Sequence, residues 1–310
     1  MCTTKSGPMT FDFGDGNGPV SAHRHQNPDG SEGGWVADTA TVEPTVYVGK
    51  DARVSDQARV SDKARVSDQA WVYGSAWVYG SAQVYGSAWV YGSAVVYGSA
   101  VVFGKARIFD QARIFDQARV SDQARVSDQA VVYGSAQVFG SAQVYGSAQV
   151  YGSAVVYGSA WVYGSAVVYG SARVFGSAWV YGSAQVFGSA VVFDSAVVSG
   201  KAWVYGEAVI SGSAQISGSA RITSSDDYVH GVWKGLPWTL SKQEDATIGK
   251  VNLDVPEAYL DLMERVYWVT SKRKNPSESL QKVLLALERD LTLRQELKDF
   301  LLREDITKIN

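Results

Sequence analysis

This sequence has little of what most globular folds depend on. Its 310 residues include one cysteine, three methionines and three histidines. The single Cys2 cannot form an internal disulfide, so the fold does not depend on an oxidising compartment. Leucine, isoleucine and methionine are scarce over most of the chain, whereas valine and tyrosine are abundant. Because valine and tyrosine favour pleated structure, this composition excludes a helical bundle for the bulk of the chain.

Strong charge of either sign is also missing. The net charge is −3, which argues against a general nucleic-acid coat because such a coat needs a basic surface. An aromatic content of 12% opposes disorder. No apolar run is long enough to span a bilayer and no signal-peptide core follows Met1, so we expect a soluble, cytoplasmic protein.

What the sequence has is a repeat of six residues, Ala-x-Val-x-(Gly/Asp)-(Ser/Gln/Lys). Every sixth residue from Ala40 to Ala220 is alanine except Val46, and two residues after each comes valine or isoleucine. This makes 31 units without an insertion. Self-similarity at a fixed short period is the signature of a stacked repeat architecture.

Each unit has a physical interpretation. Side chains alternate faces along a strand, so Ala and Val point to one side and the two x residues to the other. Gly or Asp followed by a polar residue supplies a corner. Four residues of strand and a two-residue corner turn through about a third of a circle, so three units form one coil. We therefore predict a mainly β fold, a triangular parallel β-helix of about ten coils with a thin core of Ala and Val.

The repeat resembles the left-handed β-helix hexapeptide-repeat superfamily, and its YGSA wording is similar to phage and prophage solenoid proteins with VYGNA-type repeats. Those proteins often carry a GGWV segment before the repeats, and residues 31–36 read SEGGWV. The resemblance covers about residues 40–223. It departs from the superfamily pattern after the aliphatic position, where this chain has Tyr, Phe or Ser. Left-handedness is implied by the resemblance and not by the spacing.

The flanks divide the chain further. Residues 1–34 are rich in Gly, Pro, Asp and Asn and predict a flexible N-terminal arm. The solenoid is expected over residues 35–224, with Trp35–Val48 covering its first edge, and a cap or linker with short strands over 225–254. Residues 255–310 show helical apolar spacing and predict a small α-helical module. That module is interpreted as an end cap or as an oligomerising element.

Outward positions predict three aromatic walls, because residues 18 apart stack in register if three units form a coil. The expected columns run from Tyr79 to Tyr205, from Tyr73 to Tyr181 and from Tyr85 to Phe193. Self-stacking of aromatics is one explanation, and binding of a partner is the other. The candidate binding residues are Trp71, Trp77, Trp89, Tyr151, Trp161, Tyr163, Tyr169, Trp179, Tyr181 and Trp203.

Charge is banded along the predicted rod. Arg53, Arg59 and Arg65 form one girdle with Asp56, Asp62 and Asp68. A second girdle contains Arg107, Arg113, Arg119 and Arg125 with Asp110, Asp116, Asp122 and Asp128. Mutual Arg–Asp pairing is the simpler explanation, and an anionic partner on the second girdle is the alternative.

Signs of catalysis are absent from the repeats. The resemblance implies acyltransferases with a catalytic His and extruded loops, or carbonic anhydrases with three His ligands, yet no unit contains His. The histidines are His23, His25 and His230, of which His23 and His25 are two apart and do not close a metal site. Gly14, Gly16 and Gly18 are interpreted as loop because no strand and helix frame them. We expect no catalytic residue, no metal and no cofactor.

The sequence therefore favours a non-enzymatic structural or binding solenoid that presents aromatic walls to a protein partner or to copies of itself. A dimer or trimer through the C-terminal helices is one form of self-assembly. The resemblance implies a phage-type accessory or host-interaction role. The alternatives are a hexapeptide acyltransferase and an ice- or glycan-binding solenoid.

Overall fold

The computed structural model describes residues 9–225, 228–233, 236–242 and 248–251, the last three ranges by their backbone alone. The chain divides into two compact units, residues 1–177 and 178–310. Each is described by itself below. Cys2 and the predicted helical module over 255–310 lie outside the described residues.

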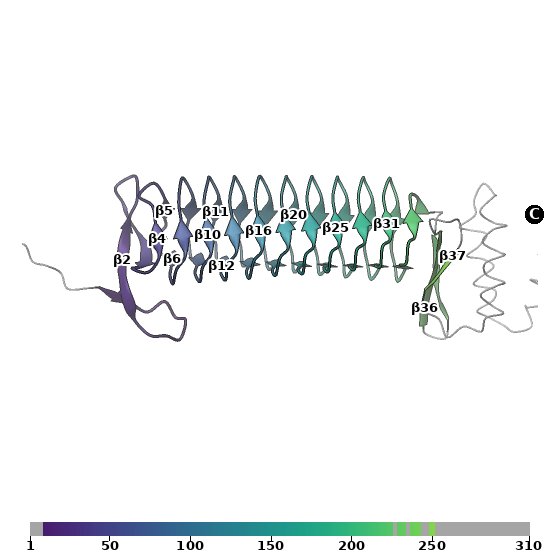
Figure 1. Cartoon of the computed structure of the whole chain (residues 1–310), viewed down its shortest axis with the longest axis horizontal. Helices are drawn as coiled ribbons and strands as arrows, with labels where there is room; N and C mark the ends of the chain where they lie inside the picture. The colour runs from purple at the N-terminus through teal and green to yellow at the C-terminus, as the bar shows by residue number, and fades with distance from the viewer. Residues whose placement is uncertain (1–8, 226–227, 234–235, 243–247, 252–310) are drawn as a thin grey trace, which may run out of the picture. The chain divides into compact units, whose positions relative to one another are not determined.

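The first unit is a stack of coils in which every hexapeptide contributes one short strand (Figure 1). Its strands fall into three parallel sheets, and each strand pairs with the strand one coil, or 18 residues, further on, as Trp77 does with Val95. The predicted three units per coil are thereby confirmed. The recorded strands are two residues long, shorter than the four residues predicted, because the backbone turns on both sides of the x–Val pair.

The strands of the first unit group as follows. The first sheet contains β3 (Glu32–Ala37), β6 (Arg53–Val54), β9 (Trp71–Val72), β12 (Trp89–Val90), β15 (Arg107–Ile108), β18 (Arg125–Val126), β21 (Gln143–Val144) and β24 (Trp161–Val162). The second contains β4 (Thr41–Val42), β7 (Arg59–Val60), β10 (Trp77–Val78), β13 (Val95–Val96), β16 (Arg113–Ile114), β19 (Val131–Val132), β22 (Gln149–Val150) and β25 (Val167–Val168). The third contains β5 (Tyr47–Val48), β8 (Arg65–Val66), β11 (Gln83–Val84), β14 (Val101–Val102), β17 (Arg119–Val120), β20 (Gln137–Val138), β23 (Val155–Val156) and β26 (Arg173–Val174).

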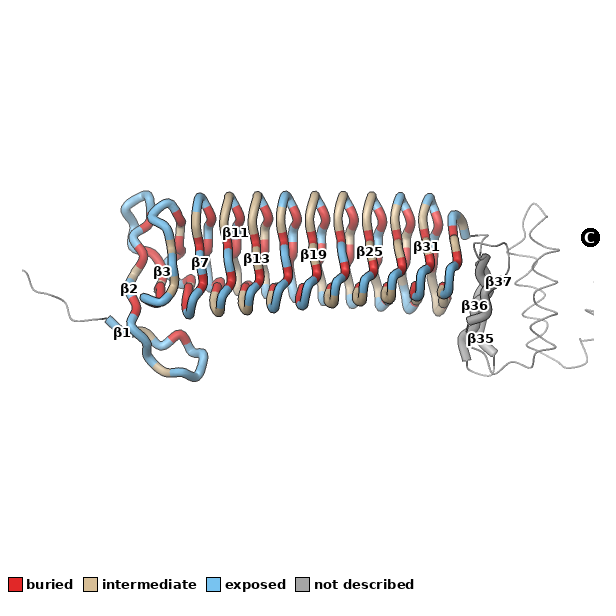
Figure 2. The backbone as a smooth tube through the Cα atoms, viewed as in Figure 1, coloured by how far each residue is buried: buried red, intermediate tan, exposed pale blue. Residues whose placement is uncertain are grey.

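The core consists of the Ala and Val or Ile columns. These side chains are completely buried in every unit from Ala52 to Ile222, while most residues between them, apart from Trp71 and a few serines, are half-buried or exposed (Figure 2). Small residues suit this interior because larger side chains would overpack it. The predicted alternation of faces is confirmed throughout.

Neighbouring coils are joined by a regular set of backbone hydrogen bonds. In one typical unit, Trp77 N donates to Ala94 O at 2.9 Å, Tyr79 N to Val96 O at 3.0 Å and Ser81 N to Gly98 O at 2.7 Å. These N–H groups all donate to the coil that follows in sequence. The coil at the N-terminal end therefore presents carbonyl groups that no preceding coil can satisfy.

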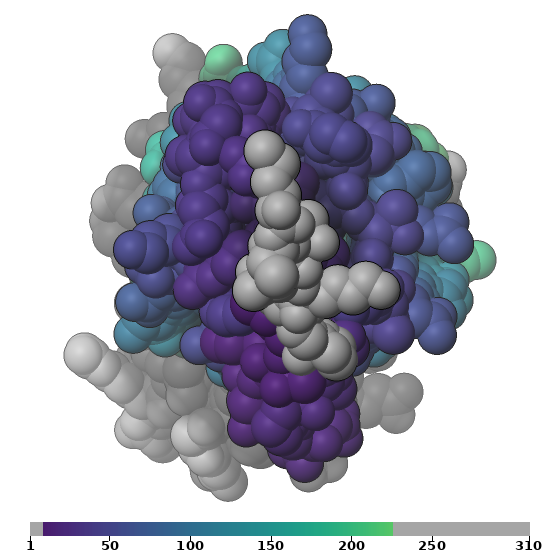
Figure 3. All heavy atoms as spheres, turned by 90° about the vertical axis from the view of Figure 1, so that its left-hand side faces the viewer, coloured from purple at the N-terminus to yellow at the C-terminus, as the bar shows by residue number. Residues whose placement is uncertain are grey.

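A cap made of residues 9–37 covers that end (Figure 3). β1 (Thr10–Phe11) pairs antiparallel with β2 (Val20–Gln26), β2 pairs antiparallel with β3, and β3 pairs in parallel with β6. The prediction of a flexible arm is thus wrong for residues 9–34. Gly and Asn in this segment form tight turns between strands and do not mark a disordered region.

Side chains of the cap form hydrogen bonds with the exposed backbone groups of the first coil. His25 Nε2 donates to Val46 O at 2.9 Å, and the Arg24 guanidinium donates to Lys50 O at 2.8 Å. Asn27 Oδ1 accepts from Val48 N at 2.8 Å. Side chains of β2 and the following turn thereby replace the hydrogen bonds of a missing coil.

The second unit contains the same kind of coil. Its strands are β27 (Trp179–Val180), β30 (Val197–Val198) and β33 (Gln215–Ile216) in one sheet, β28 (Gln185–Val186), β31 (Trp203–Val204) and β34 (Arg221–Ile222) in another, and β29 (Val191–Val192) with β32 (Val209–Ile210) in a third. Counted over both units, the repeats make about ten coils, as predicted.

After β34 the pattern changes to an antiparallel sheet. β35 (Tyr228–Trp233), β36 (Leu236–Lys242) and β37 (Ile248–Val251) pair in chain order, so the short strands predicted after Ile222 are present. The backbone of β36 lies close to that of β33 and β34. The described residues contain no α-helix, and hence no helix long and apolar enough to cross a membrane.

Candidate binding surface

The outward residues that follow each Val form ladders of stacked aromatic rings. In the second sheet of the first unit the ladder runs from Tyr79 to Tyr169 without a break: Tyr79, Tyr97, Phe115, Tyr133, Tyr151 and Tyr169. Successive ring centroids are 4.7–5.1 Å apart and the ring planes lie within 15° of each other. In the first and third sheets, Ser127 and Ser121 interrupt the corresponding ladders. Within the first unit, the stacked columns expected from the 18-residue register are confirmed.

Stacking determines which part of each ring remains accessible. Both faces of an inner ring such as Tyr97 are covered by the rings of the neighbouring coils, so edges and hydroxyl groups point outward. Burial raises the pKa of Tyr73 to about 12 and also raises the pKa values of Tyr79 and Tyr133. These three tyrosines are therefore neutral at physiological pH, and the ladders present ring edges, not faces.

The ten predicted aromatic binding residues differ in exposure. Trp77 and Trp179 are each 41% exposed, whereas Trp71 is only 8% exposed. The other seven are half-buried: Trp89, Tyr151, Trp161, Tyr163, Tyr169, Tyr181 and Trp203. The prediction that Trp71 belongs to an open surface is wrong, because the chain covers it.

The cover on Trp71 is the loop that follows β1. Phe13 is 1% exposed and packs in one apolar cluster with Trp71, while Phe11 stacks on Trp35 with a centroid distance of 4.5 Å. Arg53 donates from Nη1 to Phe13 O at 2.9 Å, and Trp71 Nε1 donates to Ser55 Oγ at 3.0 Å. An aromatic wall of this molecule thus already holds an extended segment that carries phenylalanine.

The arginines of the predicted girdles do not pair with the aspartates. Within the described part of the chain, no ion pair joins Arg107, Arg113, Arg119 or Arg125 to a carboxylate, and the expected Arg–Asp pairing is wrong. Several girdle arginines lie over aromatic rings instead, as Arg107 lies over Trp89 at 4.7 Å and Arg119 over Phe103 at 5.6 Å.

The aspartates have a backbone role. Each of the eight corner aspartates has a positive φ of 53–59°, the conformation that glycine adopts in the other units. Asp122 Oδ2 accepts from Gly140 N at 3.0 Å, and the same bond recurs from Asp56, Asp62, Asp68, Asp116, Asp128 and Asp194 to the glycine one coil later. Asp is tolerated here because its short carboxylate bonds locally.

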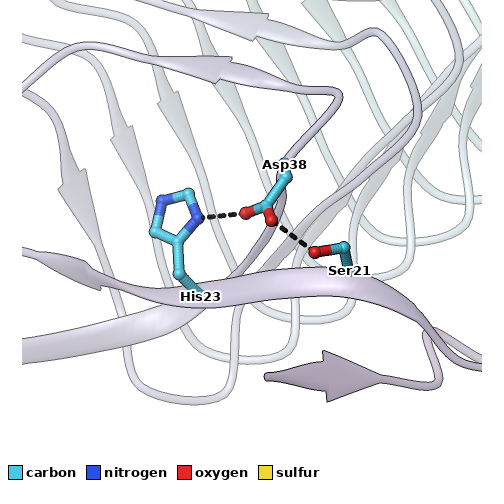
Figure 4. A network of polar contacts seen from close by, with 3 residues as sticks. All are labelled: Ser21, His23 and Asp38. Atoms are coloured by element: carbon cyan, nitrogen blue, oxygen red, sulfur yellow. Dashed lines mark hydrogen bonds and ion pairs between the residues drawn. The ribbon is translucent and has the colours of Figure 1, made fainter. Parts of the chain in front are cut away.

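The cap also contains a polar network that sequence reasoning missed. Ser21 Oγ donates to Asp38 Oδ2 at 2.5 Å, and His23 Nδ1 lies 2.8 Å from Asp38 Oδ1 (Figure 4). The antiparallel pairing of β2 with β3 brings these side chains together, a contact that no short motif indicates. The carboxylate lies between the hydroxyl and the imidazole. A serine nucleophile requires the imidazole to contact the hydroxyl, so this network orients the cap and does not activate Ser21.

The two neighbouring histidines have separate partners. His23 is about half exposed and bonds Asp38, whereas His25 is 6% exposed and bonds Val46 O. Burial lowers the pKa of His25. Within residues 9–225 no cluster of three or more His, Cys, Asp or Glu suits a metal ion. His230 lies in β35, where side chains are outside the description.

The glycine-rich loop between β1 and β2 uses its amides internally. Asp12 Oδ1 accepts from Gly14 N at 2.8 Å and Asp15 Oδ1 from Asn17 N at 2.9 Å. Gly14, Gly16 and Gly18 have φ values of 77–88°, which glycine adopts without strain. The interpretation of this segment as loop is confirmed.

Comparison with known proteins agrees with this geometry. A family model described as the YdcK beta solenoid repeat matches residues 82–98 and 148–164, both within the first unit. The chain is a β-solenoid repeat protein. No curated protein shows significant similarity to it. The solenoid's matched segments are two stretches of the WVYGSA and QVYGSA type, which form parts of the aromatic ladders.

Proposed function

We propose that this solenoid is a non-enzymatic structural and binding protein that presents its aromatic columns to a protein partner or to other copies of itself. The observation that carries the proposal is the burial of Phe13 and Trp71 together in one apolar cluster. It is an internal example of a peptide segment held on an outward tryptophan. Ring edges, hydroxyl groups and half-exposed tryptophans combine apolar area with polar contacts, which is typical of protein interfaces.

The finer structural part of the proposal is a left-handed, triangular coil of the hexapeptide-repeat superfamily. The six-residue period and the three sheets support the triangular coil, and the resemblance alone supports its left-handedness. The SEGGWV segment and the YGSA repeats support a phage-type accessory or host-interaction role in the cytoplasm. The C-terminal residues 255–310 are proposed as a second assembly element on the strength of their apolar spacing alone.

The ladders are less suited to ligands that require an exposed aromatic face than to a protein partner. A sugar ring stacks on an aromatic face, yet ladder faces are covered by neighbouring rings. Glycan binding therefore depends on the more exposed tryptophans, Trp77 and Trp179, and we rank it below protein binding.

The assembly form of the proposal is tested by substituting two wall tryptophans. Trp161→Gln with Trp179→Gln replaces them by the residue that occupies the same repeat position in Gln83 and Gln137. We expect an unchanged melting temperature and a lower assembly mass by light scattering on a sizing column, since apolar area at the interface is lost.

The matched control is Val155→Gln with Val167→Gln, which makes the same polar replacement at the same repeat position without removing an aromatic ring. It should leave the mass unchanged. A full-length chain that is a monomer at all accessible concentrations, or a mass that responds equally to both double variants, contradicts self-assembly through the aromatic walls.

A further inference from the structure

The site that holds Phe13 occurs a second time, six residues along the chain. The first copy, here called the covered site, consists of Arg53, Ser55, Trp71 and Tyr73. The second copy, here called the open site, consists of Arg59, Ser61, Trp77 and Tyr79. In both copies the arginine pairs in register with the tryptophan one coil later.

The two sites have the same ring geometry. The Trp71–Tyr73 and Trp77–Tyr79 pairs both have a centroid distance of 4.4 Å and an interplanar angle of 35°. Each tyrosine stacks on the tyrosine of the next coil, at 4.8 Å in the covered site and 4.9 Å in the open site. Each tryptophan Nε1 faces a serine hydroxyl, at 3.0 Å and 3.5 Å respectively.

They differ in what lies on top. Trp71 is 8% exposed and lies in one buried cluster with Phe13, and Arg53 donates to Phe13 O. Trp77 is 41% exposed and Arg59 is exposed. Within the described residues the Arg59 guanidinium makes no hydrogen bond or ion pair, although its counterpart Arg53 holds a peptide carbonyl.

The duplication is partial: Trp89, which meets Trp71 edge to face at 5.6 Å, and Ala37 of the same cluster are replaced by Val95 and Glu43 at the equivalent positions. Phe11 stacks on Trp35, whereas the residue six positions after Trp35 is Thr41. A segment on the open site would thus be anchored by one aromatic ring and one carbonyl. Such a single anchor predicts a weak, rapidly exchanging complex.

We propose that the open site binds an extended segment of a partner protein that carries a phenylalanine, in the manner in which the covered site holds Phe13. The phenylalanine ring packs on Trp77, and the carbonyl of that residue accepts a hydrogen bond from Arg59. The inference rests on the proposed binding role of the aromatic columns and names both the place and the chemistry of the partner.

The chain supplies its own probe. A synthetic peptide of residues 9–18, Met-Thr-Phe-Asp-Phe-Gly-Asp-Gly-Asn-Gly, contains the segment that occupies the covered site. Titrated into the full-length protein, it should bind saturably with one equivalent per chain and shift the Trp77 indole signal in NMR spectra. Trp77→Gln should weaken binding at least tenfold, Arg59→Gln several-fold, and the control Val131→Gln, at the same repeat position three coils later, less than twofold. Phe13→Ala in the peptide should abolish binding.

A gain-of-function variant tests the inference without relying on a loss of binding, which misfolding could also cause. The third sheet has Arg65, Ser67 and Tyr85 in the corresponding places, but Gln83 where the other two sites have tryptophan. Gln83→Trp should therefore create a second binding equivalent. Absence of peptide binding to the full-length protein, equal binding by Trp77→Gln, or one unchanged equivalent in Gln83→Trp each overturn the inference. The assembly mass is measured separately. A chain that does not self-associate but still binds the peptide therefore contradicts the self-assembly proposal alone.

Discussion

At the scale of single residues, the corner position of the repeat accepts two residue types, Gly and Asp. A Cβ added at Gly74 would lie 2.9 Å from Gly92 N, a distance that side chains avoid, and φ is +70°. Asp122 and its equivalents occupy the same conformation. Their carboxylate offsets the strain because it accepts the amide of the glycine in the next coil.

Substitution of Asp122 tests this balance. Asp122→Ala keeps the left-handed strain and removes the acceptor for Gly140 N, so it should lower the free energy of unfolding by about 1–3 kcal/mol. Asp122→Gly loses the hydrogen bond but removes the strain, and should cost less than Asp122→Ala. Urea unfolding of both variants measures the difference, and an alanine variant as stable as the glycine variant contradicts the assigned role.

The sequence predicts the fold better than it predicts the environment of each residue. The Ala and Val columns were predictable because one-dimensional spacing determines which face a strand residue occupies. Trp71 and Trp77 have the same neighbours in sequence, yet one is buried and the other exposed. Trp71 lies in a buried cluster with Phe13, 58 residues earlier in the chain, and packs edge to face on Trp89, and no local pattern contains these contacts.

At the scale of elements, the N-terminal cap takes the place of a missing coil. Polar side chains of β2 and the following turn form the hydrogen bonds that such a coil would form. Composition alone suggested a loop because Gly, Asn and Asp dominate the turns, while β2 and β3 contain few apolar residues. The pairing of β2 with β3 includes a register shift between Arg24 and Gln26. Such irregular pairing leaves no regular alternation in the sequence for a prediction to use.

The cap should weaken in acid. The folded protein holds His25 with a pKa below its ordinary value of 6.5, chiefly because burial disfavours the imidazolium. The unfolded chain therefore takes up this proton more readily, and stability present at neutral pH is lost as the pH falls below about 6.5. Hydrogen exchange of the Val48 amide, compared at pH 7.5 and 5.5 after correction for the intrinsic rate, should show reduced protection at the lower pH.

His25→Gln is the matched control, since an amide can donate to Val46 O without titrating. Its protection should be less dependent on pH than that of the unmodified protein, while His23→Gln should retain the wild-type dependence. Equal pH dependence in His25→Gln and the unmodified protein would show that another group is responsible.

At the scale of the whole molecule, the repeat makes stability approximately a sum over coils. Deletion of residues 137–154 removes 18 residues and keeps every column in phase. Deletion of residues 137–145 removes nine and places Gly146 after Ala136, which puts glycine where an outward strand residue belongs. We expect the first deletion to change the melting temperature by only about a few degrees and the second to abolish cooperative unfolding, as followed by circular dichroism.

The coil count and the sheets were predictable because 31 uninterrupted units leave one consistent stacking register. The binding surface was predictable only in part. The ladders follow from that register, whereas the second Phe13-type site and its Arg59 depend on which side chains a distant segment covers. The match to the YdcK beta solenoid repeat reflects the same periodicity and does not indicate a binding partner.

The hydrogen bonds between coils also determine how the molecule responds to force. They run from each coil to the next, so a pull on the two ends of the chain loads one coil at a time and not all of them together. Each released coil frees 18 residues, or about 60 Å of extended chain. Stretching would then proceed as a series of small, even steps, and the solenoid would behave as an extensible tether that rewinds from whatever coils remain.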